Sequence, residues 1–356
     1  MRSISLRLMN GRSTYSHGLP RQVLLVLKFG PGVALMEFNT QSLSASFLKI
    51  LSSARKITGK RSYFTFLIGL FLIFSKIRPY FYVWYSYFRW VDDLADSHGS
   101  TIAEKQLFIN RQEKLVKYLY RYPSGRKYDL YGPEVFLTAL IPFDKKRGSP
   151  LKKPILDLLS CISFDVNRVG IYPEQQQLSR YIELEVTSYL KTFRSFCCPE
   201  ANLADFPRPW EGIAGKWTHI IRDLVPDLKN GIINISREDR DNIRIKIVGQ
   251  HIESIDPALK TWVAAKVRDC EIWFQQGKQN LLSYPELRYK TGIAVLCAKY
   301  EYYLNIIEKN GYQLKESYSF DLRNFCSSLA KLLRHLGTIF STHFRNYYPS
   351  TSFMPE

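Results

Sequence analysis

The sequence lacks the features that define several common protein classes. None of its six cysteines forms a C-x-x-C pair, and its six histidines show no metal-ligand spacing. The apolar run Tyr63–Phe74 ends after twelve residues, whereas a helix that crosses a membrane needs about 20. These absences argue against a disulfide scaffold and a zinc framework. They predict buried thiols in a reducing compartment and no membrane-spanning helix.

Acidic residues are absent from the first 35 positions, and the first one in the chain is Glu37. An acid-free start that contains arginine and serine is typical of a mitochondrial transit peptide. The alternative is an over-extended reading frame, because the stretch that begins at Met36 also has the character of a natural start. Under both interpretations we expect residues 1–35 to lie outside the fold.

Positive charge is in excess: the 356-residue chain has a formal net charge of +18 and is 46% hydrophobic. The hydrophobic fraction predicts a folded globule with a large core. The charge favours a polyanionic partner, such as nucleic acid, an anionic membrane or a phosphorylated substrate, or else it reflects a lysine-rich surface.

Helical periodicity dominates the chain, and glycine- and proline-containing turns separate the periodic segments. No alternating strand pattern is sustained. The fold class that we predict is all-α, with a single domain over residues 40–345 and a tail over 346–356. The expected helices are 42–56, 62–75, 79–97, 101–121, 132–141, 151–166, 177–196, 208–225, 237–251, 257–282, 286–309 and 320–346.

One expected helix, Phe81–Ser97, is apolar nearly all round and yet ends in three aspartates. Helical spacing places four polar side chains on one face, whereas Asp93 falls about 100° away on a flank. The four are Tyr85, Arg89, Asp92 and Asp96. Carboxylates one turn apart suit Mg²⁺, which prefers one or two carboxylates together with phosphate oxygens. The alternative is an ordinary solvent-exposed acidic helix end with an Arg–Asp pair.

A second stretch has similar spacing about 130 residues later. Its one face carries Lys216, His219, Asp223 and Asp227, with Arg222 and Lys229 beside the two aspartates. Two such helices can face each other across a cavity, where bridging Mg²⁺ ions would hold a diphosphate. Apolar walls would then enclose an isoprenoid chain and keep water away from a carbocation.

These two motifs together resemble those of the squalene/phytoene synthase family. Tyr85-x3-Arg89-x2-Asp92-Asp93-x2-Asp96 is similar to the first aspartate-rich motif of the family, and Trp217–Gly231 is similar to the second. Lys60–Phe64 matches the basic, serine and aromatic start of the family's domain. The resemblance covers about residues 60–345 and implies an isoprenoid-synthase-type helical bundle around a central apolar cavity.

The resemblance also implies an activity, which is the Mg²⁺-dependent head-to-head condensation of two farnesyl or geranylgeranyl diphosphates to a squalene- or phytoene-type product. The metal would be held by Asp92, Asp96, Asp223 and Asp227, with His219 as a further candidate ligand. Diphosphate would be bound by Arg89, Arg222, Lys229, Lys216 and Ser62. Tyr85 would lie beside the reacting carbons and stabilise a cation. Mn²⁺ could replace Mg²⁺, and NADPH is not indicated.

The sequence departs from the family pattern at several positions. Lys216 and His219 replace a glutamine and an asparagine, and the lysine could supply a fixed charge in place of one metal ion. Pro226 is expected to kink the helix before Asp227. The segment 185–189 replaces a patch of small residues and would reshape the prenyl tunnel.

Another pair of residues, Asp165 and Arg168, echoes a family element. We expect a structural ion pair there first and phosphate ligands second.

Other functions remain open at this stage. One is a terpene-cyclase-like variant that uses one prenyl diphosphate. Another is a non-catalytic scaffold, because the family resembles in part a mitochondrial complex I assembly factor. No recognition motif supports nucleic-acid binding. We expect peripheral membrane contact, because the implied substrates and products are lipids, and a cytoplasmic location unless residues 1–35 direct the chain to a mitochondrion or plastid.

Overall fold

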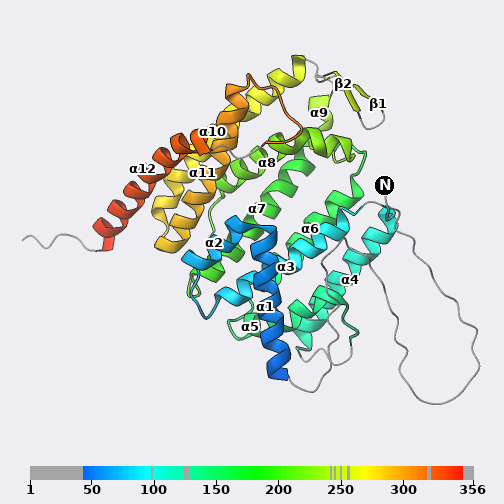
Figure 1. Cartoon of the computed structure of the whole chain (residues 1–356), viewed down its shortest axis with the longest axis vertical. Helices are drawn as coiled ribbons and strands as arrows, with labels where there is room; N and C mark the ends of the chain where they lie inside the picture. The colour runs from blue at the N-terminus through cyan, green and yellow to red at the C-terminus, as the bar shows by residue number, and fades with distance from the viewer. Residues whose placement is uncertain are drawn as a thin grey trace, which may run out of the picture.

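The computed structural model describes residues 43–97, 99–123, 128–204, 206–240, 243, 246–248, 251–254, 257–318 and 322–347. The described chain is predominantly α-helical, as predicted (Figure 1). The helices are α1 Leu43–Arg61, α2 Tyr63–Leu72, α3 Arg78–Ala95, α4 Ile102–Arg121, α5 Val135–Lys145, α6 Lys152–Asn167, α7 Gln175–Cys197, α8 Trp210–Lys229, α9 Arg237–Arg240, α10 Pro257–Ser283, α11 Leu287–Lys309 and α12 Leu322–Tyr347. A short 3₁₀ helix, η1 Gly132–Glu134, precedes α5.

Local sequence signals account for several helix starts. Thr101 and Glu104 form a capping box at α4, in which each side chain binds the backbone of the other. Pro79 lies in the first turn of α3, where its missing N–H removes no helical hydrogen bond. Such signals fix the first turns of helices independently of the rest of the fold.

Helices α7 and α8 run through the middle of the bundle (Figure 1). Helix α8 packs against α7, α10 and α11, while α7 also packs against α6. Helix α3 packs against α1 and α5 and also contacts α6. One contiguous core connects these helices, and its largest fully buried side chains include Tyr82, Tyr87, Phe196, Phe274 and Tyr289. The two aspartate-bearing helices, α3 and α8, are therefore held by a shared core.

One predicted helix, 237–251, is wrong. The chain forms only the single turn α9 there and continues into an antiparallel hairpin of β1 Lys246–Val248 and β2 His251–Ser254. The pairing joins Val248 to His251. The physical reason lies in the composition, because isoleucine and valine favour strands.

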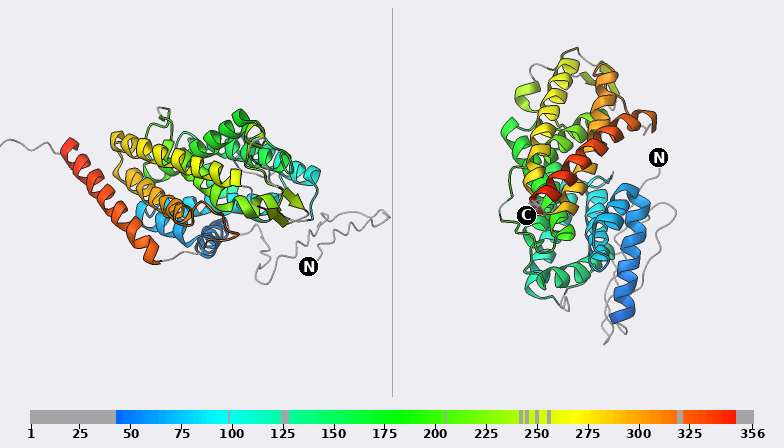
Figure 2. Two further views of the ribbon diagram at one scale, coloured as in Figure 1. Left: turned by 90° about the horizontal axis from the view of Figure 1, so that it is seen from above. Right: turned by 90° about the vertical axis from the view of Figure 1, so that its left-hand side faces the viewer.

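The ends of the chain lie partly beyond the described residues. The predicted extension 1–35 is outside them, as is the tail after Tyr347. Helix α12 packs along α11 on the outside of the bundle (Figure 2). Among the helices that the structure describes, none has the length and apolarity needed to span a bilayer.

Candidate active site

The first aspartate pair lies where α3 ends. Asp92 occupies the last turn and Asp96 is the C-terminal cap residue. Burial, followed by the charge of Asp96, raises the pKa of Asp92 to about 7. Burial and then the charge of Asp165 on α6 raise the pKa of Asp96. The pair thus forms a concentration of negative charge that nearby protein cations do not fully offset.

Arg89 is shared between two carboxylates of the same helix. Its guanidinium lies 3.3 Å from Asp92 and 2.5 Å from Asp93. Asp93 also pairs with Arg61 of α1 at 2.9 Å. Asp93 therefore faces α1, while Arg89 links Asp92 and Asp93 at the end of α3. The predicted contact of Arg89 with diphosphate stays a prediction.

The second motif lies on α8, and its first aspartate is already well paired. Arg222 donates two hydrogen bonds to Asp223, of 2.7 and 2.5 Å, and His219 lies 2.8 Å from the same carboxylate. Burial acts to raise the pKa of Asp223, but the hydrogen bonds from Arg222 and His219 outweigh it and hold this pKa well below its usual range. Asp223 is consequently ionised throughout the physiological range.

The pKa of Asp227 is shifted in the opposite direction from that of Asp223. Burial and then the neighbouring charge of Asp223 raise the pKa of Asp227 to about 7. Its carboxylate accepts one hydrogen bond of 3.1 Å from the amide of Asn234. Helix α8 continues through Pro226 to Lys229. The helix therefore does not end at the proline, and the expected kink before Asp227 stays a prediction.

Lys216 lies between the two motifs. Its Nζ is 2.6 Å from Oε2 of Glu185 and donates a 3.0 Å hydrogen bond to the hydroxyl of Tyr181, both on α7. Burial opposes its charge, but Glu185 and Asp165 outweigh that effect and raise the pKa of Lys216. The same ammonium lowers the pKa values of Asp92 and Asp227. One fixed cation thus acts on one carboxylate of each aspartate pair.

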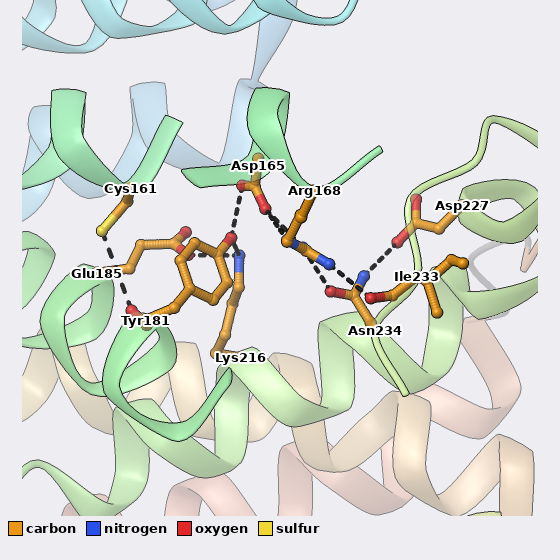
Figure 3. A network of polar contacts seen from close by, with 9 residues as sticks. All are labelled: Cys161, Asp165, Arg168, Tyr181, Glu185, Lys216, Asp227, Ile233 and Asn234. Carbon is orange, nitrogen blue, oxygen red and sulfur yellow. Dashed lines mark hydrogen bonds and ion pairs between the residues drawn. The ribbon is translucent and has the colours of Figure 1, made fainter. Parts of the chain in front are cut away.

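A chain of polar contacts continues from Lys216 toward Asp227 (Figure 3). The Tyr181 hydroxyl donates to Asp165 at 2.7 Å, and Asp165 pairs with Arg168 at 2.5 Å. Arg168 donates in turn to Asn234 at 2.7 Å. The predicted Asp165–Arg168 ion pair is therefore confirmed, and it forms part of a network that ends at the second aspartate motif.

The site is accessible as well as enclosed. The side chains of Asp92 and His219 are each 45% exposed, yet burial is the leading influence on both pKa values, raising that of Asp92 and lowering that of His219. Asp92 of α3 and His219 of α8 both respond to the charge of Lys216, so the two motifs approach the same ammonium.

Aromatic side chains contribute to the same region. Tyr189 of α7 packs edge-on against Trp84 at 5.5 Å between ring centroids. The charges that act on its hydroxyl include those of Glu185, Asp92 and Tyr85. Tyr85 is partly buried against the core. Tyr85 and Asp92 thus both lie near Tyr189, and the expected place of Tyr85 beside the reacting carbons stays a prediction.

Two predicted diphosphate ligands have other partners. Ser62 is the N-cap of α2, and its hydroxyl accepts a 3.2 Å hydrogen bond from the amide of Thr65. Lys229 forms an ion pair with Glu316, which lies in the segment after α11. In the described structure each of these side chains has a partner within the chain, and their expected contacts with diphosphate stay predictions.

The aspartates of the two motifs could hold Mg²⁺ only together with a bound ligand that supplies further oxygen atoms. No group of three or more His, Cys, Asp or Glu side chains close enough to hold a metal occurs in the described part of the chain. The carboxylates come instead in pairs, and Asp92 and Asp227 have raised pKa values that an added cation would lower. Mg²⁺ commonly binds through one or two carboxylates plus substrate phosphates.

Sequence reasoning assigned no site role to three residues that the structure brings into the network: Tyr181, Glu185 and Asn234. Asn234 follows the second motif closely, and this proximity was the only available signal. Tyr181 and Glu185 contact Lys216 from another helix. Nothing in their local sequence indicates that partner.

An all-α bundle with an aspartate pair on each of two core helices defines the isoprenoid-synthase class of fold. Comparison with known proteins agrees: the squalene/phytoene synthase family matches residues 60–326. The chain therefore belongs to the squalene/phytoene synthase family.

Two solved structures share this fold at low sequence identity. A dehydrosqualene synthase in complex with ligand aligns with a TM-score of 0.63 and 18% identity, covering 83% of this chain and 99% of that one. Squalene synthase HpnC from Alicyclobacillus acidocaldarius aligns with a TM-score of 0.61 and 18% identity, covering 76% and 97%. No curated protein sequence matches the chain.

Proposed function

We propose that the protein joins two prenyl diphosphates head to head in a Mg²⁺-dependent reaction. The observation that carries this proposal is that one carboxylate of each motif, Asp92 on α3 and Asp227 on α8, lies close enough to Lys216 to respond to the charge of its ammonium. Membership of the squalene/phytoene synthase family supports the same chemistry. The reaction would need negative charge to hold metal, positive charge to hold diphosphate, and an enclosed site.

The proposed reaction has two parts. The C–O bond of one allylic diphosphate breaks, and diphosphate leaves with the bonding electrons. The double bond of the second substrate then forms a C–C bond to the resulting cation, and loss of a proton gives a cyclopropylcarbinyl diphosphate. Water must be kept from the cation, because it would otherwise trap it as an alcohol.

Mg²⁺ bound at the aspartates would neutralise charge on the leaving diphosphate. Asp92 and Asp96 are the first candidates to hold it, since their mutual repulsion favours an added cation. On α8 the second candidate is Asp227, because Asp223 is already paired with Arg222 and His219. Under this proposal the four carboxylates are not equivalent, because Asp92, Asp96 and Asp227 would hold metal while Asp223 stays paired with protein cations.

Lys216 would orient the diphosphate between the two pairs. Glu185 and Tyr181 fix the ammonium at 2.6 and 3.0 Å, so it costs little further ordering when an anion binds. In this position the ammonium would do part of the electrostatic work of a metal ion. The rings of Tyr85 and Tyr189 would stand near the developing carbocation and stabilise it with their π-faces.

The test uses the purified full chain with Mg²⁺ and labelled farnesyl or geranylgeranyl diphosphate. Release of diphosphate and a product with two prenyl units, both lost in Asp92→Ala/Asp96→Ala, are the expected results. Mass spectrometry of the lipid product identifies the chain length. Absence of turnover together with absence of Mg²⁺-dependent binding of either diphosphate would contradict the enzymatic proposal and favour the scaffold.

One observation favours a second candidate, a cyclase-like reaction of a single prenyl diphosphate. Glu185 and Tyr189 lie in the segment where the family pattern has small residues. Glu185 pairs with Lys216 of α8, and Tyr189 packs on Trp84. Bulk and charge there would shorten the space for prenyl chains. A product that contains one prenyl unit would support this candidate over the condensation.

A further inference from the structure

Two parts of the chain contain no acidic residue although basic residues are frequent in both. Residues 38–91 include neither aspartate nor glutamate, and residues 322–347 also include neither. The first part provides α1, α2 and most of α3, and the second provides α12. Surfaces built from these helices can therefore carry charge of only one sign from their own side chains.

The same helices expose aromatic side chains to solvent. Phe71, in the last turn of α2, is 73% exposed, and Phe74 just beyond that helix is 45% exposed. On α12, Phe340 and Phe344 are 38% and 54% exposed. They are four positions apart and therefore share one face of the helix, which also includes the exposed Leu333.

Helix α11 brings the ends of α2 and α12 together. Leu72 of α2 packs so closely on Gly292 that a Cβ there would lie 3.0 Å from its side chain. Helix α12 packs along α11, where burial, followed by the charge of Lys290, lowers the pKa of His343 on α12. Both contacts involve the first turns of α11. The exposed aromatics of α2 and α12 thus flank the same end of one helix, and Figure 2 shows α12 at the outer side of the bundle.

Basic side chains are interleaved with these aromatics. The Arg288 guanidinium, at the start of α11, stacks 3.7 Å above the ring centroid of Phe74. Lys76 and Arg345 are exposed beside Phe74 and Phe344. Glu286, the residue just before α11, forms an ion pair of 2.6 Å with Arg194, and both side chains are largely buried. We call the group Phe71, Phe74, Arg288, Phe340, Phe344 and Arg345 the α2–α12 surface.

We propose that the α2–α12 surface binds an anionic lipid bilayer, with its phenylalanines inserted at the boundary between headgroups and acyl chains. Exposed aromatics beside basic residues, on a helix with one apolar face, are the features that favour such a position. Anionic headgroups add an attraction for each basic side chain close to the membrane. A second copy would place positive charge against positive charge, which opposes self-association through this face.

The experiment measures sedimentation of the full chain with vesicles of phosphatidylcholine and with vesicles that contain about one third phosphatidylglycerol. Binding is expected on the anionic vesicles and should weaken as salt is raised. Phe340→Ser/Phe344→Ser should weaken binding more than about tenfold, because two large apolar side chains lose their burial. Phe71→Ser/Phe74→Ser should have an effect of similar size, and Arg288→Gln/Arg345→Gln should weaken only the anionic component.

The matched control is Leu107→Ser on α4, since Leu107 is as exposed as Phe71 at 73% but lies outside the surface. This control should leave vesicle binding unchanged, and circular dichroism should show that every variant is folded. Residues 1–35 are present in all variants, so their own positive charge does not affect the comparison.

Two results would overturn the proposal: equal binding of the wild type and both phenylalanine pairs, or loss of a dimer instead of vesicle binding in those variants. The inference does not rest on the proposed chemistry, because vesicle binding and turnover are measured separately.

Discussion

Nζ of Lys216 on α8 lies 2.6 Å from Oε2 of Glu185 on α7, and each side chain is only 17% exposed. This pair stands where the family pattern carries a neutral amide on one helix and a small residue on the other. The two substitutions are therefore compatible with each other: the carboxylate neutralises part of the lysine charge, and the lysine keeps the carboxylate from being buried alone. The relationship leads to the first prediction.

Lys216→Gln should destabilise the protein by about 3 kcal/mol, because it leaves Glu185 buried without its cation. Lys216→Gln/Glu185→Gln should recover most of that loss, which urea unfolding would measure. In isothermal titration with inorganic diphosphate, Lys216→Gln should also bind more weakly and need a higher Mg²⁺ concentration. If Lys216→Gln bound diphosphate with the same Mg²⁺ dependence as the wild type, Lys216 would not act as a partial substitute for metal.

Asp92→Asn/Asp96→Asn should raise the thermal stability of the metal-free protein. Burial and mutual repulsion raise the pKa values of these carboxylates, so neutral amides remove an unfavourable charge. The same variant should lose Mg²⁺-dependent diphosphate binding and at least about a hundredfold in turnover. Calorimetry and product assays would measure the two effects.

The matched control for this pair is Asp93→Asn. Asp93 is paired with Arg61 and Arg89 and faces α1, so the control should not raise stability and should retain diphosphate binding. Equal loss of binding in the control would show that the end of α3, rather than the metal pair, was disturbed.

Asn234→Ala should weaken Mg²⁺-dependent diphosphate binding by about tenfold or more, although Asn234 itself is not expected to touch metal. Its amide holds Asp227 at 3.1 Å and accepts from Arg168 at 2.7 Å. Loss of a hydrogen-bond partner of a ligating carboxylate commonly reduces metal affinity to this extent. Titration of Mg²⁺ in the presence of inorganic diphosphate would show the change, and unaltered affinity would contradict a positioning role.

Because Glu211 is buried, we expect the stability of the folded protein to depend on pH through a group outside the candidate active site. Glu211 is 4% exposed at the start of α8, and burial raises its pKa from 4.5 to about 7. The folded state therefore retains the proton more tightly than the unfolded state. Stability from this group is fully present below pH 4.5, declines as pH rises, and is lost above about pH 7; the loss amounts to about 3 kcal/mol.

Glu211→Gln removes this titration and should stabilise the protein at pH 8 while having little effect at pH 4. Urea unfolding at several pH values would measure the difference between variant and wild type. Glu183→Gln, at a side chain that is 45% exposed, serves as the control and should leave the profile unchanged. Parallel profiles for wild type and Glu211→Gln would contradict the prediction.

The sequence by itself determined the helical class, most helix positions and both aspartate motifs, because these depend on spacing within one helix. Asp92 and Asp96 share a face through the 3.6-residue period alone, and the capping box of α4 is likewise local. The region 237–251 was misjudged for a related reason: a short apolar run fits a helix or a hairpin, and strand pairing decides between them.

Only the tertiary structure determined which side chains contact one another in the candidate site. Glu185 and Tyr181 meet Lys216 only because α7 packs on α8, and Arg168 meets Asn234 only because the end of α6 lies against the segment that follows α8. The protonation states followed from the same packing: Asp223 is paired and Asp227 is largely not, although the two lie one turn apart. Burial and long-range contact set these properties, and neither is encoded in the spacing of residues along one helix.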